Sequence, residues 1–161
     1  MAVTQIPNEL IEFGVKTFGT SSIMLGDTTT GTIDAADNNT GVGVDVFAAL
    51  TSGDNNTIIG KSAGTAITSG SDNTLVGKDA GLAITTGTDN VAIGQSALKA
   101  VTTGHNSLAI GGNSLEALTS GSENIGIGRL AGNSLTSESY NTGVGYSALR
   151  YVTSSYNTAL G

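Results

Sequence analysis

One glycine recurs at a fixed interval along most of this chain, and that interval constrains the fold more than any other feature. The glycines recur with an exact period of 17, and each closes a short motif such as Asn73-Thr-Leu-Val-Gly77. A final copy ends at Gly161, one position short of the next full period. A fixed period of about 20 residues is typical of a solenoid, in which each repeat packs only on its neighbours. The recurring glycines are Gly26, Gly43, Gly60, Gly77, Gly94, Gly111, Gly128 and Gly145.

The composition agrees with a thin core that is repeated along an axis. The chain has 161 residues, of which 24 are glycine and only 12% are charged, and it contains no cysteine. Its net charge of -7 and its six scattered Lys and Arg residues disfavour nucleic acid as a partner, because phosphate binding needs clustered basic residues. Without cysteine, neither a disulfide framework nor a thiolate metal site is possible.

The motif predicts a short strand whose two faces can be assigned by alternation. With each recurring glycine as position 0, position −1 is always Ile, Val or Leu, and position −2 faces the opposite way. We expect position −1 to lie inside the coil with the aliphatic residues at position +7, and the glycines at 0 and +10 to adopt positive φ in sharp turns. The predicted interior ladder is Val42, Ile59, Val76, Ile93, Ile110, Ile127 and Val144, with Leu50, Ile67, Ile84, Val101 and Leu118.

Position −2 is then expected on the outside, where it is uncharged in every coil. An uncharged stripe on an outer face usually marks a contact with another chain. We therefore predict an inter-chain stripe at Ile58, Leu75, Ala92 and Ala109. Because each coil offers only about three interior apolar residues, the stripe favours a homo-oligomer, with a trimer as the expected form.

The segment after each strand is expected to form short strands or irregular turns. Segments such as 63–67 could instead form single helical turns, as in leucine-rich repeats. Gly64, Gly81 and Gly132 within these segments disfavour a helix.

Residues 1–21 stand outside the repeat, whereas residues 22–161 form the predicted solenoid shaft with a divergent first coil at 27–43. The first segment alternates as a short strand does, beginning near Pro7, and two interpretations remain open: a cap on the first coil, or an arm that docks on another protein. Neither a signal peptide nor a membrane span is evident. The predicted attachment arm comprises Ile6, Pro7, Leu10, Ile11, Phe13, Val15 and Phe18.

No constellation for chemistry emerges, so we expect no enzyme, no cofactor and no metal. Gly60-Lys61-Ser62 lacks the upstream glycine of a phosphate-binding loop, and His105 is the single histidine. Threonine recurs at position +8, from Thr51 to Thr153. These threonines either satisfy backbone groups in the turns or form an ice-binding face.

The repeat unit Asn-Thr-x-(Ile/Val)-Gly-x-x-Ala resembles the repeats of bacteriophage tail-fibre proteins. It is also similar to the head repeats of trimeric autotransporter adhesins, whose kernel appears here as Val91-Ala-Ile-Gly-Gln-Ser-Ala97. The resemblance covers about residues 38–161. Adhesin head units are usually shorter and carry a signal peptide and an anchor, so the viral fibre is favoured.

The resemblance implies an intertwined homotrimeric β-roll fibre in the virion that attaches to a tail or adaptor protein through residues 1–21. A distal part beyond residue 161 is expected to carry host-receptor recognition or a chaperone. The alternatives are a bacterial surface adhesin, which would be extracellular, and an ice-binding β-solenoid.

Overall fold

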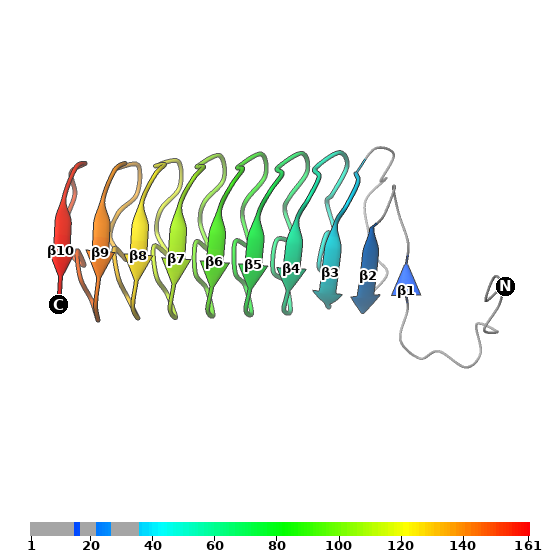
Figure 1. The fold of residues 1–161 in the computed structure, drawn as a ribbon, viewed down its shortest axis with the longest axis horizontal. Helices are drawn as coiled ribbons and strands as arrows, with labels where there is room; N and C mark the ends of the chain where they lie inside the picture. The colour runs from blue at the N-terminus through cyan, green and yellow to red at the C-terminus, as the bar shows by residue number, and fades with distance from the viewer. Residues whose placement is uncertain (1–14, 17–21, 27–35) are drawn as a thin grey trace, which may run out of the picture.

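The computed structural model describes residues 15–16, 22–26 and 36–161. These residues form one ten-stranded sheet in the order β1 to β10, and no helix occurs among them. Figure 1 shows the strands side by side along the axis of a solenoid. The all-β solenoid fold is thus confirmed. The strands are β1 Val15–Lys16, β2 Ile23–Gly26, β3 Thr40–Gly43, β4 Thr57–Ile59, β5 Thr74–Val76, β6 Val91–Ile93, β7 Leu108–Ile110, β8 Ile125–Ile127, β9 Thr142–Val144 and β10 Thr158–Leu160.

Strands β2 to β10 are parallel, and each pairs with the strand one coil further on. Ile58 lies opposite Leu75, its equivalent in the next coil, and this offset is kept from coil to coil until β9. At the end, Thr142 pairs with Thr158, so the missing residue is absorbed between β9 and β10. Each coil hydrogen-bonds to the next coil of the same chain. Among the described residues, each strand from β3 to β9 is therefore paired on both sides with strands of the same chain.

The strand β1 belongs to the segment outside the repeat and runs antiparallel to β2, with Val15 opposite Leu25 and Lys16 opposite Met24. It therefore occupies the edge of the sheet at the N-terminal end, as a cap would. The other predicted arm residues lie outside the described residues, as do positions 27–35 of the divergent coil. Those arm residues are Ile6, Pro7, Leu10, Ile11, Phe13 and Phe18.

The segment that follows each strand from β3 to β9 is an irregular turn. Its backbone enters the left-handed region at positions +2 and +4, as at Ser62 (φ 56°) and Gly64 (φ 55°), or Ser96 (φ 58°) and Leu98 (φ 50°). Left-handed residues at alternate positions interrupt any right-handed helical turn. The expectation of irregular turns is confirmed for these segments, and the helical alternative is wrong.

The two faces of the strands are the reverse of the prediction. Side chains at position −2 point into the coil, and Ile58 and Leu75 are fully buried. Side chains at position −1 point outward, and Ile59 is 42% exposed. The predicted inter-chain stripe at Ile58, Leu75, Ala92 and Ala109 is thus core. The interior ladder is wrong for Val42, Ile59, Val76, Ile93, Ile110, Ile127 and Val144, and it is confirmed for the buried Leu50, Ile67, Ile84, Val101 and Leu118.

The faces were assigned the wrong way round because a uniform residue type does not identify the interior of the coil. The interior is identified by side-chain volumes at facing positions that compensate one another. A large side chain at position −2 accompanies glycine at position +4: a Cβ atom on Gly64 would lie only 2.5 Å from Cδ1 of Ile58. Where position −2 is small, as at Ala109, position +4 usually supplies a large buried side chain such as Leu115; Gly126 and Gly132 are both small, and there Leu115 of the preceding coil fills the space. Close-packed interiors require such compensation.

The glycines at position 0 and those at position +10, which occur in five coils, are required for different reasons. The anchor glycines from Gly43 to Gly145 have φ between 126° and 142°, which confirms their predicted role in turns. The glycines at position +10 do not have positive φ, so that prediction is wrong. Instead, a Cβ atom on Gly70 would lie 2.5 Å from the carbonyl oxygen of Gly87 in the next coil. Close approach between coils therefore requires glycine there.

Candidate functional site

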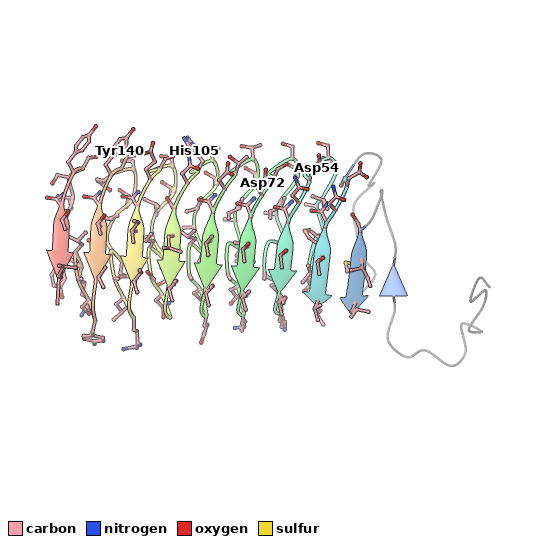
Figure 2. The ribbon with its side chains drawn as sticks, viewed as in Figure 1. Asp54, Asp72, His105 and Tyr140 are labelled. Carbon is pink, nitrogen blue, oxygen red and sulfur yellow. The ribbon has the colours of Figure 1, made fainter. Side chains whose placement is uncertain are left out.

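The outer face of the sheet carries two columns of side chains that contain no charged residue. We call this surface the outer sheet face; its side chains stand along β2 to β10 in Figure 2. Strand alternation places positions −3 and −1 on it, and position −2 beneath it. Its residues are Ile23, Thr40, Thr57, Thr74, Val91, Leu108, Ile125, Thr142 and Thr158 at position −3, and Leu25, Val42, Ile59, Val76, Ile93, Ile110, Ile127, Val144 and Leu160 at position −1.

The outer sheet face is most apolar at its centre. In β6, β7 and β8 both outward positions are aliphatic, and Ile93 and Ile125 are 40% and 36% exposed. In β3 to β5 and in β9 and β10, position −3 is threonine instead. The surface thus has an aliphatic block of three coils between threonine-bearing coils, and its first strand, β2, is again aliphatic at both outward positions, with Ile23 and Leu25. Uncharged apolar surface of this extent usually marks a contact site.

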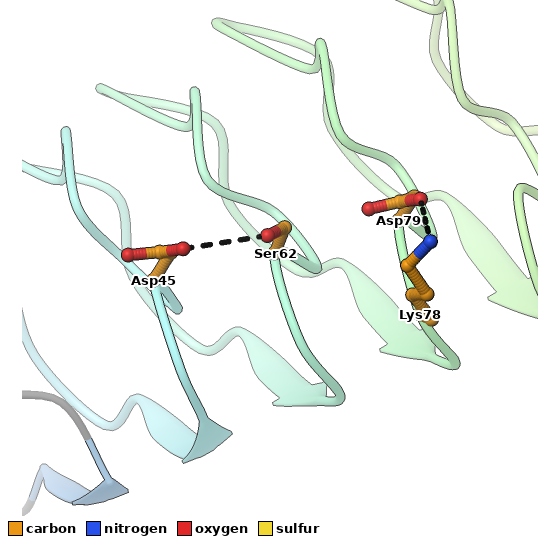
Figure 3. Close-up of polar contacts among 4 residues, drawn as sticks. All are labelled: Asp45, Ser62, Lys78 and Asp79. Atoms are coloured by element: carbon orange, nitrogen blue, oxygen red, sulfur yellow. Dashed lines mark hydrogen bonds and ion pairs between the residues drawn. The ribbon is translucent and has the colours of Figure 1, made fainter.

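Charged residues flank this face on both sides, and their sign differs between the side where the strands begin and the side where they end. Before the strands lies the acidic edge, formed by the exposed Asp72, Asp89 and Glu123 among neutral residues. After the strands lies the basic edge, formed by the exposed Lys61, Lys78 and Arg129, with the half-buried Asp45 and Asp79 one position further along the coil, at position +2. Figure 2 labels Asp72 beside the strand beginnings, and Figure 3 shows Lys78 beyond a strand end, 3.2 Å from Asp79. Because β2 to β10 all run the same way, the two edges keep opposite charge.

A buried asparagine at position −4 fixes the beginning of most strands. The backbone N–H and Nδ2 of Asn73 both donate to Oδ1 of Asn56 at 3.1 Å, and Nδ2 also donates to the Gly87 carbonyl at 3.0 Å. Contacts of this kind run from Asn39 to Asn157, with Ser107 in one coil. The bonds that these asparagines make between coils were not predicted from the sequence. Their recurrence at the repeat period was the signal for bonds between coils.

The hydroxyls of the threonines at position +8 from Thr51 to Thr119 each donate to a backbone carbonyl of the next coil. The hydroxyl of Thr51 donates to the Thr68 carbonyl at 2.9 Å, and that of Thr102 donates to the Thr119 carbonyl at 3.1 Å. This geometry supports the structural interpretation of these threonines. At position +2, the side chains of equivalent residues in successive coils contact each other directly: Ser62 Oγ lies 3.5 Å from Asp45 Oδ2 (Figure 3).

All four tyrosines lie in the C-terminal coils, and all are exposed. The rings of Tyr140 and Tyr156 stack with their centroids 4.8 Å apart. The negative charge of Glu123 and its hydrogen bond to the phenol raise the pKa of Tyr140. This pair was not predicted from the sequence, although the two residues occupy equivalent positions in successive coils.

The described residues offer no other constellation for chemistry. They contain no group of three His, Cys, Asp or Glu residues able to hold a metal ion. His105 lies in an exposed turn with Nδ1 3.2 Å from Ser122 Oγ. Within the same residues, no helix is long and apolar enough to cross a membrane.

Comparisons with known proteins do not assign the chain to a family. No protein-family model, no curated protein and no solved structure matches it.

Proposed function

We propose that this chain is a structural protein without enzymatic activity that forms the shaft of a homotrimeric fibre. The observation that carries the proposal is the continuous parallel pairing of β2 to β10, with core residues and polar bonds that recur along the described coils. Nine parallel strands spaced about 4.8 Å apart make a rod of about 40 Å. Such a rod is suited to separating two attachment points.

The likeness of the repeat to those of bacteriophage tail fibres supports placing this shaft in a virion. In this proposal, residues 1–21 attach the shaft to a tail or adaptor protein of the virion, and a distal part recognises the host surface receptor. The partners are two further copies of the chain and these attachment proteins; nucleic acid and membrane insertion have no part. A bacterial surface adhesin with an extracellular location is the alternative within the same structural class.

The assembly is tested by light scattering on the purified full chain. A mass near three times 15.9 kDa supports the fibre, and a well-folded monomer contradicts it. The virion assignment needs a separate test. Gold-labelled antibodies against the chain should mark the tail fibres of the phage that encodes it, and labelling of a bacterial surface would contradict the phage proposal.

Ice binding is a second candidate, because of the threonines on the outer sheet face. In β3, β4 and β5 the outward pair is threonine with Val or Ile, repeated in register. A flat repeating rank of hydroxyl and methyl groups could order water. Thermal hysteresis in a solution of the monomer would support this candidate, and its absence would remove it.

A further inference from the structure

We infer that the outer sheet face is where copies of this chain meet, with the copies parallel and in register, coil against coil. This inference rests on the proposed fibre and adds to it the surface, the direction and the axial alignment. The occupant of the face is a second copy of the chain. Four independent properties of the described residues favour this occupant.

The first property is the distribution of charge. Each copy carries a net charge of -7, so two copies repel each other unless they meet through a surface that is free of like charge. The outer sheet face has no charged residue in either column from β2 to β10. Its aliphatic centre, at Ile93 and Ile125 among others, gains from removal from water.

The second property is the axial repeat. Side chains on this face recur at the spacing of parallel strands, about 4.8 Å. A second copy has the same spacing, so side chains of one copy fit between those of the other along the whole rod. A partner without this repeat matches the surface only locally.

The third property is the position of the two charged edges, which distinguishes the two possible directions. If facing rods run parallel, the strand beginnings of one copy lie beside the strand ends of the other, and the acidic edge meets the basic edge. If the rods run antiparallel, acidic edge meets acidic edge. In register, Asp72 of one copy lies in the same layer as Lys78 of the next, and Glu123 in the same layer as Arg129. Complementary edges therefore favour the parallel arrangement.

The fourth property is the order of side chains along the face. In a parallel, in-register assembly the aliphatic block of β6 to β8 meets its own equivalent, threonine meets threonine in β3 to β5, β9 and β10, and Ile23 meets Ile23 in β2. An antiparallel pair can superpose this block only by centring β7 on β7. The parallel arrangement needs no such centring, because it matches every described strand of the face with its own equivalent at once.

The area of the outer sheet face indicates that its two edges also take part in the contact between copies. Nine strands spaced about 4.8 Å apart and three residues wide give a flat surface of roughly 400 Å². A stable interface buries about 800 Å² on each partner. Contact therefore has to include the acidic and basic edges, which are complementary only in the parallel arrangement.

Single-cysteine crosslinking tests the inference, and the chain has no cysteine of its own. Thr57→Cys in β4 and Thr158→Cys in β10 place one exposed thiol three strands on either side of β7. These two positions lie about 29 Å apart along one rod. Facing sheets lie about 10 Å apart, beyond the reach of a disulfide, so a short bismaleimide is the reagent. Ser69→Cys, in a turn outside both edges, is the matched control.

The expected result is a shift from the one-chain to the two-chain band for Thr57→Cys alone and for Thr158→Cys alone, but not for Ser69→Cys. Products that form only when differently tagged Thr57→Cys and Thr158→Cys chains are co-expressed would show antiparallel rods and overturn the inference. An oligomer in light scattering that no face cysteine crosslinks would overturn the inference and leave the fibre standing. A monomer without crosslinks would overturn both, and thermal hysteresis of that monomer would assign the face to ice.

Discussion

Leu75 and Gly81 share a single space in the core. A Cβ atom on Gly81 would lie 2.8 Å from Cδ1 of Leu75. The next coil reverses the sizes, since its equivalent residues are Ala92 and Leu98, both fully buried. Gly81 and Leu98 have nearly the same backbone, with φ of 56° and 50°. Each of these coils thus holds one large side chain, which either position can supply.

This relationship predicts that the two residues can be exchanged only together. Leu75→Ala should lower the free energy of unfolding by about 2–5 kcal/mol, because it leaves a cavity. Gly81→Leu alone should also destabilise the chain, by about 1–3 kcal/mol, because it overfills the core. The double variant Leu75→Ala/Gly81→Leu reproduces the pair found one coil later and should recover most of the stability. Urea unfolding of the full chain measures all three.

Coupling between the two sites is the decisive quantity in this experiment. Losses that simply add in the double variant would show that the two residues do not share a space. Leu75→Ala/Gly112→Ala is a matched control, because Gly112 does not touch Leu75 and its added Cβ meets nothing closer than 4.0 Å. It should remain as unstable as Leu75→Ala.

The same residues show what the sequence could predict and what it could not. The constant period was sufficient for the parallel register, because identical positions must stack when every coil has equal length. Alternation along the strand separated two faces, but it could not tell which face was inside. Position −1 is uniformly aliphatic and was assigned to the core. The inverse sizes at positions −2 and +4, such as Ile58 with Gly64, were the sequence signal that identified the interior.

The buried asparagine contacts lead to a second prediction. Oδ1 of Asn73 accepts from the backbone N–H of Asn90 at 3.1 Å and from its Nδ2 at 3.2 Å. Asn73→Ala leaves these donors without that acceptor, so the free energy of unfolding should fall by about 1–3 kcal/mol for each one left unsatisfied. Thermal unfolding by circular dichroism measures the loss. A change in a turn, Ser69→Ala, should leave the melting temperature unaltered.

Ser107 allows the converse experiment. It interrupts the asparagine series, and its hydroxyl accepts from the Asn124 backbone N–H at 3.2 Å. Ser107→Asn should add an acceptor for Nδ2 of Asn124 and raise the stability by about 1 kcal/mol. A decrease in the melting temperature would show that the space at this position does not accommodate the amide.

A third prediction concerns pH and the tyrosine pair. The charge of Glu123 raises the pKa of Tyr140, so Tyr140 should ionise at higher pH than an unperturbed tyrosine. Because the folded-state pKa is raised, the unfolded chain loses its phenolic proton first, and the contribution of Tyr140 to stability is lost as pH rises above about 10. Glu123→Gln should move the last step of the tyrosinate absorbance titration to lower pH. An unchanged titration would contradict the role of Glu123, and Glu116→Gln is the control.

The turn glycines mark a second limit of sequence reasoning. Position 0 was predictable, because a sharp turn after a strand needs positive φ. Position +10 recurs just as regularly at Gly53, Gly70, Gly87, Gly104 and Gly121, yet its cause lies in the next coil. A pattern along one chain does not distinguish a conformational requirement from a close approach between neighbouring segments.

Two glycine-to-alanine variants separate these causes. Gly70→Ala would place Cβ 2.5 Å from the Gly87 carbonyl oxygen and force two coils apart, so the free energy of unfolding should fall by about 3 kcal/mol. Gly112→Ala meets nothing closer than 4.0 Å and lacks positive φ, so it should leave stability unchanged or raise it by about 0.4–1 kcal/mol. Urea unfolding midpoints measure both. Equal losses would mean that general backbone flexibility, and not contact between coils, explains the glycine at position +10.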